Sequence, residues 1–319
     1  MDHRPNVHPQ TAIIALAIAV SACATVATTA TPVPAPFEAI SLQGDTLRGI
    51  PLSAEARARY ETQLAAARAA YEQRPTDPDS IIWLARRLGY LGRFGEGIDV
   101  YTKGIALYPD NAWMYRHRGH RYISVRKLDA AIGDLERAAR LVQGTPDQVE
   151  PDGQPNAQNT PIGTLHSNID YHLALAYYLK GDYRRALPIY QRELAAARND
   201  DRRVSIAYWH YLALRRLGRD AEAAAVLAPI TPDLHVIEND SYRDLLLMYK
   251  GAISPDSIMK AAGTNHASTQ YVTLAYGVAN WHMLFGRRDD GIRLLREIVA
   301  GGNWPAFGFI AAEADLSRR

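Results

Sequence analysis

The sequence is short of cysteine, of charge imbalance and of long apolar runs. Its 319 residues include one cysteine, Cys23, so the chain cannot close an internal disulfide and packing must supply its stability. The 36 basic and 34 acidic residues leave a formal net charge of +2, which gives no reason to expect nucleic acid as a partner. The apolar run at residues 12–20 is shorter than the stretch of about 20 residues that spans a bilayer.

Catalytic and cofactor motifs are also missing from the sequence. It has no nucleophile elbow, phosphate-binding loop, zincin helix or paired-cysteine motif. His117 and His120 are spaced to share a helix face, as metal ligands can, but no carboxylate or cysteine beside them completes a site. We therefore expect a protein that is not an enzyme, with no cofactor and no metal. An enzyme or enzyme subunit stays open as an alternative, because catalytic groups are assembled in space.

The sequence does contain an internal repeat. Alanine and leucine are abundant and β-branched alternation is scarce, which favours an all-α class. Residues 78–111 and 112–145 align at an offset of 34, and the aligned positions hold small residues or large apolar ones in both copies. The aligned pairs are Ala85 with Gly119, Leu88 with Tyr122, Gly97 with Ala131, Ile98 with Ile132, Tyr101 with Leu135 and Gly104 with Ala138.

The small residues of the repeat predict where two helices cross. Packed helix axes lie about 8–10 Å apart, so Gly or Ala is favoured at the closest approach. Gly92 supplies the turn between two helices, and Pro109 follows the second helix, which it cannot continue. This recurring pattern resembles the tetratricopeptide repeat (TPR) family. The resemblance implies an all-α fold, a TPR-like superhelical array of antiparallel helix pairs, or α-solenoid.

The same register predicts further units along residues 53–319. Ser53 is placed to cap a leading helix that continues to Tyr71. Further hairpins are expected from Ser167, from near Val204 and from near Val272. An eroded unit is expected between the last two, with Leu245 and Met248 on one helix and Ile258 and Ala261 on a shorter one. Residues 304–316 are expected to form a closing helix over the last apolar face.

Two segments break the helical pattern. Residues 142–164 are rich in Pro, Gly, Asn and Asp, and this long loop is either a tolerated surface insertion or a lid over a groove. Its acids Asp147, Glu150 and Asp152 lack the spacing of a calcium loop. Residues 37–51 give no clear pattern and are expected to be irregular.

The N-terminus is typical of a targeting segment. Arg4 precedes the apolar run, and residues 20–23 (Val-Ser-Ala-Cys) resemble the bacterial lipoprotein processing box. The resemblance implies a signal peptide at 1–22, lipid attachment at Cys23, a Pro/Thr-rich tether at 23–52 and a periplasm-facing outer-membrane lipoprotein of the bacterial cell envelope. One acyl chain binds marginally, so several chains are needed for firm membrane anchoring. The alternative is an ordinary secretory signal and a secreted or soluble periplasmic protein.

The TPR resemblance also implies a binding surface. In that family the first helix of each hairpin lines the concave face and supplies most ligand contacts. Carried over by position, it nominates Arg86, Tyr90, Trp113, Arg116, His120, Tyr171, Tyr178, Tyr208, Arg215 and Arg216. Guanidinium groups pair bidentately with carboxylates and aromatic rings give rigid contact area, so the groove suits an extended acidic peptide. We expect a non-catalytic scaffold for a protein or peptide ligand. The other interpretation is that these are ordinary solvated or inter-repeat side chains.

One basic stretch offers a different function. Residues 113–127 hold five Arg or Lys side chains, two histidines and no acid. Such a stretch is expected either to bind an anionic envelope component, such as a lipid headgroup, or to be balanced by acids on neighbouring helices.

Overall fold

The computed structural model describes residues 1–2 and 36–318. The predicted signal peptide at 1–22, the lipid-attachment residue Cys23 and the start of the tether lie outside these described residues, apart from residues 1–2. Residues 36–318 belong to one compact unit. Within the described residues, no helix combines the length and the apolarity that a membrane crossing requires.

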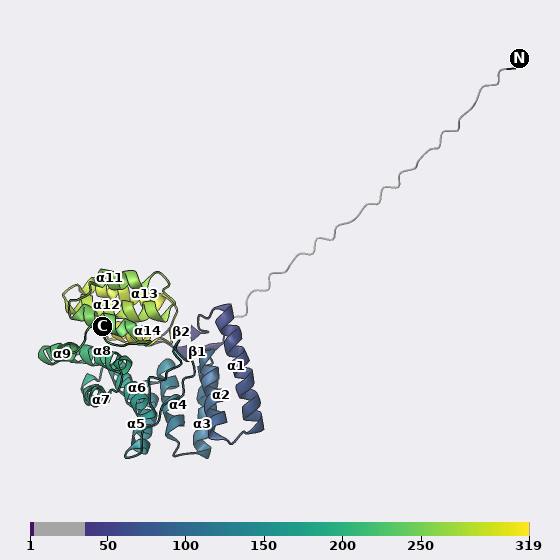
Figure 1. Ribbon diagram of the computed structural model, residues 1–319, viewed down its shortest axis with the longest axis horizontal. Coiled ribbons are helices and arrows are strands. Elements are labelled where there is room, and N and C mark those ends of the chain that lie inside the picture. The colour runs from purple at the N-terminus through teal and green to yellow at the C-terminus, as the bar shows by residue number, and fades with distance from the viewer. Residues whose placement is uncertain (3–35, 319) are drawn as a thin grey trace. The chain divides into compact units, whose positions relative to one another are not determined.

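The described unit is built almost entirely of helices, which confirms the predicted all-α array (Figure 1). One long helix, α1 (Ala54–Gln73), leads the array, and its N-cap is Ser53, as predicted. Antiparallel pairs follow it: α2 (Pro78–Tyr90) with α3 (Phe94–Leu107), α4 (Ala112–Ser124) with α5 (Leu128–Val142), α6 (Leu165–Lys180) with α7 (Tyr183–Ala196), α8 (Asp200–Arg216) with α9 (Asp220–Leu227), α10 (Asp240–Tyr249) with α11 (Pro255–Ala262), and α12 (Thr269–Leu284) with α13 (Arg288–Ala300). A last helix, α14 (Phe307–Ser317), closes the chain.

The predicted register agrees with these boundaries. The first two pairs start at Pro78 and Ala112, where the repeat places them. The later pairs α6, α8 and α12 start two to four residues earlier than predicted, because polar caps at Thr164, Asn199 and Ser268 begin each helix ahead of its apolar pattern. The eroded unit exists as the short pair α10 and α11.

Small residues lie at the helix crossings, as predicted. Gly97, Ala131, Ala186 and Ala223 are all buried on the second helices of their pairs. A Cβ added to Gly97 would lie 3.2 Å from the Ala85 carbonyl oxygen, and one added to Gly291 would lie 2.7 Å from the Ala279 carbonyl oxygen. The two glycines therefore meet equivalent neighbours in different pairs.

The turn inside each pair requires a left-handed residue. Glycine supplies it in five pairs, at Gly92, Gly181, Gly218, Gly251 and Gly286. In the α4–α5 turn the same position is held by Arg126, with φ +63°. A left-handed conformation costs a residue with a Cβ about 1–2 kcal/mol, so Arg126 must be held by other contacts.

Those contacts come from the C-terminal helix. Arg126 Nε and Nη2 donate to the two carboxylate oxygens of Glu313, each at 2.9 Å. Nη2 also donates to the Trp304 carbonyl oxygen at 2.8 Å. The paired side chains are only 3% and 1% exposed, so the turn of the second hairpin is fixed by a buried ion pair with α14.

Residues 37–51 were expected to be irregular, and this expectation is wrong. They include an antiparallel hairpin of β1 (Phe37–Ile40) and β2 (Thr46–Arg48), in which Ala39 faces Leu47. Ala39 and Leu47 are buried against the helical core, so the folded unit begins before Ser53 and includes part of the predicted tether. Strands of four and three residues are too short to show a reliable period in sequence.

This β-hairpin links the two ends of the array. The Glu38 carboxylate accepts a hydrogen bond from the Gly95 backbone N–H at the start of α3. On the other side, the Trp304 indole donates to the Arg48 carbonyl oxygen at 2.6 Å, and the Leu42 N–H donates to Glu313 at 3.4 Å. The first hairpin and the last helix are therefore tied together through β1 and β2.

Helix α14 is the predicted closing helix, but it packs inside the later hairpins. It contacts α12, α13 and α6. Asp315 on α14 accepts from Arg216 at 2.6 Å, and the hydroxyls of Tyr178 and Tyr276 meet at 3.0 Å beside it. The inner side of the later hairpins is thus filled by the chain itself.

Candidate functional site

The candidate site lies on the inward side of α2 and α4, beneath the long loop. The first helices of successive pairs contact one another in order, so their inward side chains form one layer. Spacing of three or four residues places Trp83, Arg86, Arg87 and Tyr90 along one side of α2. The same spacing groups Trp113, Arg116, His117 and His120 on α4. We call these eight residues the inner face.

The long loop lies against this inner face. Residues 143–164, which we call the strap, connect α5 to α6. The strap closes on itself through an isolated bridge between Val149 and Thr164, with the Glu150 N–H donating to the Gly163 carbonyl oxygen at 3.0 Å. Of the two predicted roles, surface insertion or lid, its position is that of a lid.

Arginines of the inner face hold the strap by its backbone and by one carboxylate. Arg86 Nη2 donates to the Pro151 carbonyl oxygen at 2.9 Å, and Arg87 Nη1 donates to the Gly153 carbonyl oxygen at 2.8 Å. Arg116 Nε lies 3.0 Å from Glu150 Oε2, and both side chains are 7% exposed. The inner face therefore already binds an extended acidic segment, which belongs to its own chain.

The strap separates two pockets. A pocket of about 220 Å³ is lined by Trp83 and Trp113 and, from the strap, by Gln148, Val149 and Pro151. A polar pocket of about 320 Å³ is lined by Arg116, His172 and Arg202 among others, and by Glu150 and Asp152 of the strap. From Val149 to Asp152, successive strap residues line opposite pockets, which is the two-residue period of an extended chain.

Burial keeps the histidines of this region neutral. Burial, followed by the charge of Arg116, lowers the pKa of His117 and of His172 well below the usual value. Burial, followed by Arg121, lowers the pKa of His120 in the same way. Burial also raises the pKa of Asp152 and lowers that of Arg116. The positive charge of the inner face is therefore carried by arginine.

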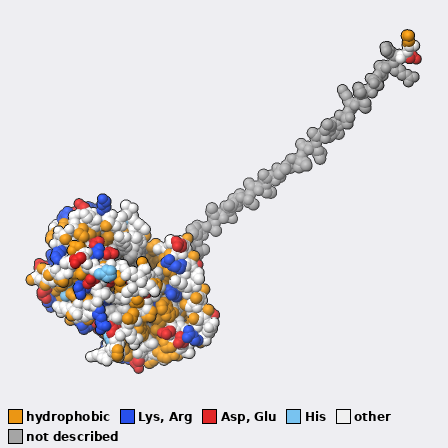
Figure 2. All heavy atoms as spheres, viewed as in Figure 1, with side chains coloured by type: hydrophobic (Ala, Val, Ile, Leu, Met, Phe, Trp, Pro, Cys, Tyr) orange, Lys and Arg blue, Asp and Glu red, His pale blue; other side chains and the backbone are white. Residues whose placement is uncertain are grey.

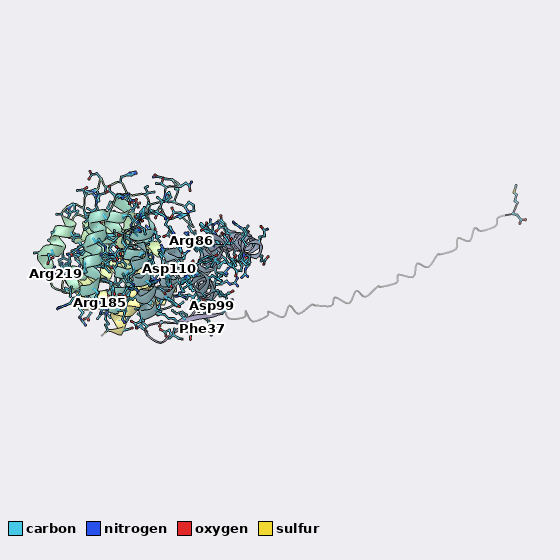
Figure 3. All side chains as sticks on the ribbon, turned by 90° about the horizontal axis from the view of Figure 1, so that it is seen from below. Phe37, Arg86, Asp99, Asp110, Arg185 and Arg219 are labelled. Atoms are coloured by element: carbon cyan, nitrogen blue, oxygen red, sulfur yellow. The ribbon has the colours of Figure 1, made fainter. Side chains whose placement is uncertain are left out.

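That positive charge exceeds what the strap neutralises. Within residues 36–318, Arg86, Arg87 and Arg121 take part in no ion pair, whereas Arg116 is paired with Glu150. Arg86, labelled in Figure 3, stacks over the Trp83 ring at 4.4 Å and uses one of its nitrogens on the strap carbonyl. The surplus favours a ligand with more negative charge than the strap supplies.

The other predicted groove residues lie in the interior. Tyr171 lines the polar pocket and accepts from the Trp209 indole at 3.0 Å. Tyr178 and Tyr208 are fully buried. Arg215 donates to Tyr211, and Arg216 binds Asn280 and Asp315. The structure therefore brings Arg86, Tyr90, Trp113 and Arg116 together at the strap, with Tyr171 beside them. His120 lies against His172 and Phe307, and the remaining four lie among the later hairpins.

The basic stretch at 113–127 does not form an exposed basic surface. Arg118 binds Asp134 with two hydrogen bonds of 2.7 and 2.8 Å, Arg116 pairs with Glu150, and Arg126 pairs with Glu313. Lys127 is exposed, whereas Arg121 is half-buried. On the face drawn in Figure 2, basic and acidic side chains are interspersed. Acids on neighbouring elements balance most of the stretch, as the second of the two interpretations expected.

Sequence reasoning missed three members of the site. Trp83 and Arg87 lie within one turn of Arg86, and their helical spacing was the signal that could have identified them. Glu150 was considered only as a calcium ligand, and no local pattern relates it to Arg116. His117 and His120, the candidate metal pair, contact aromatic rings, and no group of three or more metal-ligating side chains occurs among the described residues.

Comparison with known proteins gives likenesses of architecture. No family model and no curated protein matches the chain. It is similar to YrrB, described as a TPR protein with an unusual peptide-binding site, at 16% identity and a TM-score of 0.42, over 74% of this chain and 91% of that one. It is also similar to a chain of Naa15/Naa10 bound to HypK-THB, at 16% identity and a TM-score of 0.36, over 77% of this chain and 34% of that one. A third likeness is to the P58(IPK) TPR domain, at 14% identity and a TM-score of 0.25, over 77% and 80% of the two chains. The helix pairs themselves, rather than these likenesses, identify the TPR-like repeat architecture.

Proposed function

We propose that this protein is a non-catalytic scaffold that binds a protein or peptide ligand on the inner face of α2 and α4. The observation that carries the proposal is the docking of the strap, in which Arg86 and Arg87 bind backbone carbonyl oxygens and Arg116 binds a carboxylate. Contacts to backbone groups accept any extended segment, and the carboxylate contact selects acidic ones. The ring of Trp83 and the neighbouring pocket add rigid apolar contact area.

A displayed peptide library tests the proposal. The full chain should select peptides that bind the wild-type protein, and Arg86→Glu should weaken that binding at least about tenfold, because an attractive contact becomes repulsive. Lys103→Glu is the matched control, since this exposed lysine lies on the second helix α3 and changes charge by the same amount. Selected peptides that bind both variants equally would place ligand binding elsewhere and overturn the proposal.

The cellular setting is a second part of the proposal. The apolar run at 12–20 and the processing-box pattern around Cys23 support a lipid-anchored protein of the bacterial cell envelope, facing the periplasm from the outer membrane. Mass spectrometry of the mature N-terminus tests this. A mature chain that starts at Cys23 with acyl groups is the expected result, and a mature chain that starts at another residue without lipid would contradict it.

A further inference from the structure

The strap occupies the inner face in the way that a peptide ligand would. Its residues 149–152 run in extended form, with Val149 and Pro151 toward the tryptophan pocket and Glu150 and Asp152 toward the polar pocket. Peptides that bind grooves in extended form use the same alternation, because successive side chains point to opposite sides. Glu150 is buried, whereas Val149 and Pro151 are exposed, so the contacts of the inner face select for the acidic side chains at alternate positions.

The strap is held weakly for a segment in such a central position. Within residues 143–164 no apolar side chain is buried, and Val149 is 62% exposed. The contacts are polar. They include two arginine–carbonyl hydrogen bonds, the Glu150 contacts, a hydrogen bond of 2.6 Å from Tyr60 to Gln154, and hydrogen bonds from Leu165 N–H to the Gln148 carbonyl oxygen and from Asn199 to the Ile162 carbonyl oxygen. Segments with few buried apolar contacts belong to the low-stability end of a structure and open locally.

The ion pair between Arg116 and Glu150 determines which ligands can replace the strap. Arg116 is buried, and Glu150 is its carboxylate partner. When the strap leaves, Arg116 loses that partner, and an uncompensated buried charge is costly. A replacement that brings its own carboxylate to Arg116 restores the pair, so an acidic ligand can exchange with the strap at little net cost.

Gly153 is the strap residue that packs most closely against the inner face, so a substitution there should weaken the docking of the strap. A Cβ added to Gly153 would lie 1.6 Å from the Tyr90 hydroxyl oxygen and 2.9 Å from Arg86 Nη2. A side chain at this position therefore requires the strap, or the ends of the Tyr90 and Arg86 side chains that hold it, to move, and either movement weakens the docking of the strap without changing the sequence of the face.

We propose that the partner of this protein carries an extended segment with acidic residues at alternate positions, which displaces strap residues 148–154 from the inner face. The strap is then an internal competitor that occupies the site until such a partner arrives. This inference rests on the proposed function, because it concerns the same face. A tethered competitor acts at an effective concentration in the millimolar range, so removing it raises the apparent affinity for the partner.

A peptide with the sequence of residues 146–154 (PDQVEPDGQ), labelled with a fluorophore, is the probe. Fluorescence anisotropy measures its binding to the full chain, to Gly153→Val, and to a variant in which residues 148–154 are replaced by Gly and Ser. Both variants should bind the peptide at least about tenfold more tightly than the wild-type chain. A second peptide, with Gln and Asn in place of the acids at 150 and 152, should bind each of these proteins more weakly than the acidic peptide does. Gln158→Ala, at an exposed strap position away from the face, is the matched control and should behave as wild type.

The possible results separate the two proposals. Equal affinity of the peptide for the wild type and both strap variants overturns the competitor, while the binding function of the face stands. No binding to either strap variant, with circular dichroism showing that both are folded, overturns the alternating acidic motif, whereas the proposed function is still judged by the Arg86→Glu result. Using two variants guards against a single substitution that fails to fold.

Discussion

The buried pair between Arg126 and Glu313 makes a quantitative prediction about stability. Glu313→Gln keeps the shape of the side chain and removes its charge, which leaves a buried guanidinium without a counter-ion. Breaking a buried pair in this way costs about 3–5 kcal/mol. For a domain of this size each kcal/mol lowers the melting temperature by about 2–4 °C, so a fall of about 6–20 °C is expected.

A double-mutant cycle distinguishes this reasoning from simple loss of packing. Arg126→Gly removes the guanidinium and also releases the left-handed strain at φ +63°, which is worth about 1–2 kcal/mol. The double variant Arg126→Gly with Glu313→Gln should therefore recover much of the stability lost in Glu313→Gln alone. Urea denaturation followed by circular dichroism is the assay. Asp110→Asn is the control, because Asp110, labelled in Figure 3, pairs with Arg137 at the surface and is 79% exposed. A loss below about 1 kcal/mol in Glu313→Gln, or a double variant less stable than both single ones, would refute the buried-pair account.

Three further predictions concern packing, protonation and capping. Gly119→Ala should destabilise the chain by about 1–3 kcal/mol, because the added Cβ would lie 2.7 Å from Leu135 Cγ. Gly133→Ala should instead stabilise α5 by up to about 1 kcal/mol, because no described atom lies within 4 Å of the added Cβ. Changes of the same sign in urea midpoints would contradict this contrast. Burial lowers the pKa of His210 from 6.5 to about 4, so its contribution to stability is complete above pH 6.5 and is lost as the pH falls toward 4. The whole shift corresponds to about 3 kcal/mol, of which about 2 kcal/mol is lost between pH 7 and pH 4.5. His210→Phe should reduce the fall in unfolding free energy over that range by about 2 kcal/mol, measured by urea denaturation, and an unchanged fall would show that other groups cause it. Ser53→Ala removes the acceptor for the Ala56 N–H and should weaken α1 by about 1 kcal/mol, seen as faster amide hydrogen exchange in its first turn, while equal exchange would exclude a capping role.

The repeat architecture could be predicted because its determinants are local. A 34-residue offset aligns the crossing glycine and alanine positions, and each pair is specified by residues close in sequence. The later helix starts were misplaced by a few residues because their caps, such as Thr164, precede the apolar pattern. The β-hairpin at 37–48 was missed because its strands are stabilised by contacts with Trp304 and Glu313, far along the chain.

The site was predicted only in part, for a similar reason. The TPR resemblance nominated both Arg86 and Arg116 for the groove, but nothing local indicates that Glu150 returns to Arg116 across 34 residues. One available signal was overlooked. The repeat aligns Arg126 with Gly92, and an arginine at a position that requires a left-handed backbone indicates a contact strong enough to hold it. That contact is the one with α14, which also packs beside Tyr178 and Arg216, two of the predicted groove residues.

The hairpin of β1 and β2 changes how this array can come apart. An open stack of helix pairs melts from whichever end frays first, one unit after another, and its two ends act independently. Here the first hairpin and α14 share the same short strands, so loosening either end removes support from the other. The described unit should therefore unfold as a single cooperative body instead of unravelling stepwise, and a pull on the chain before residue 36 would load both ends at once.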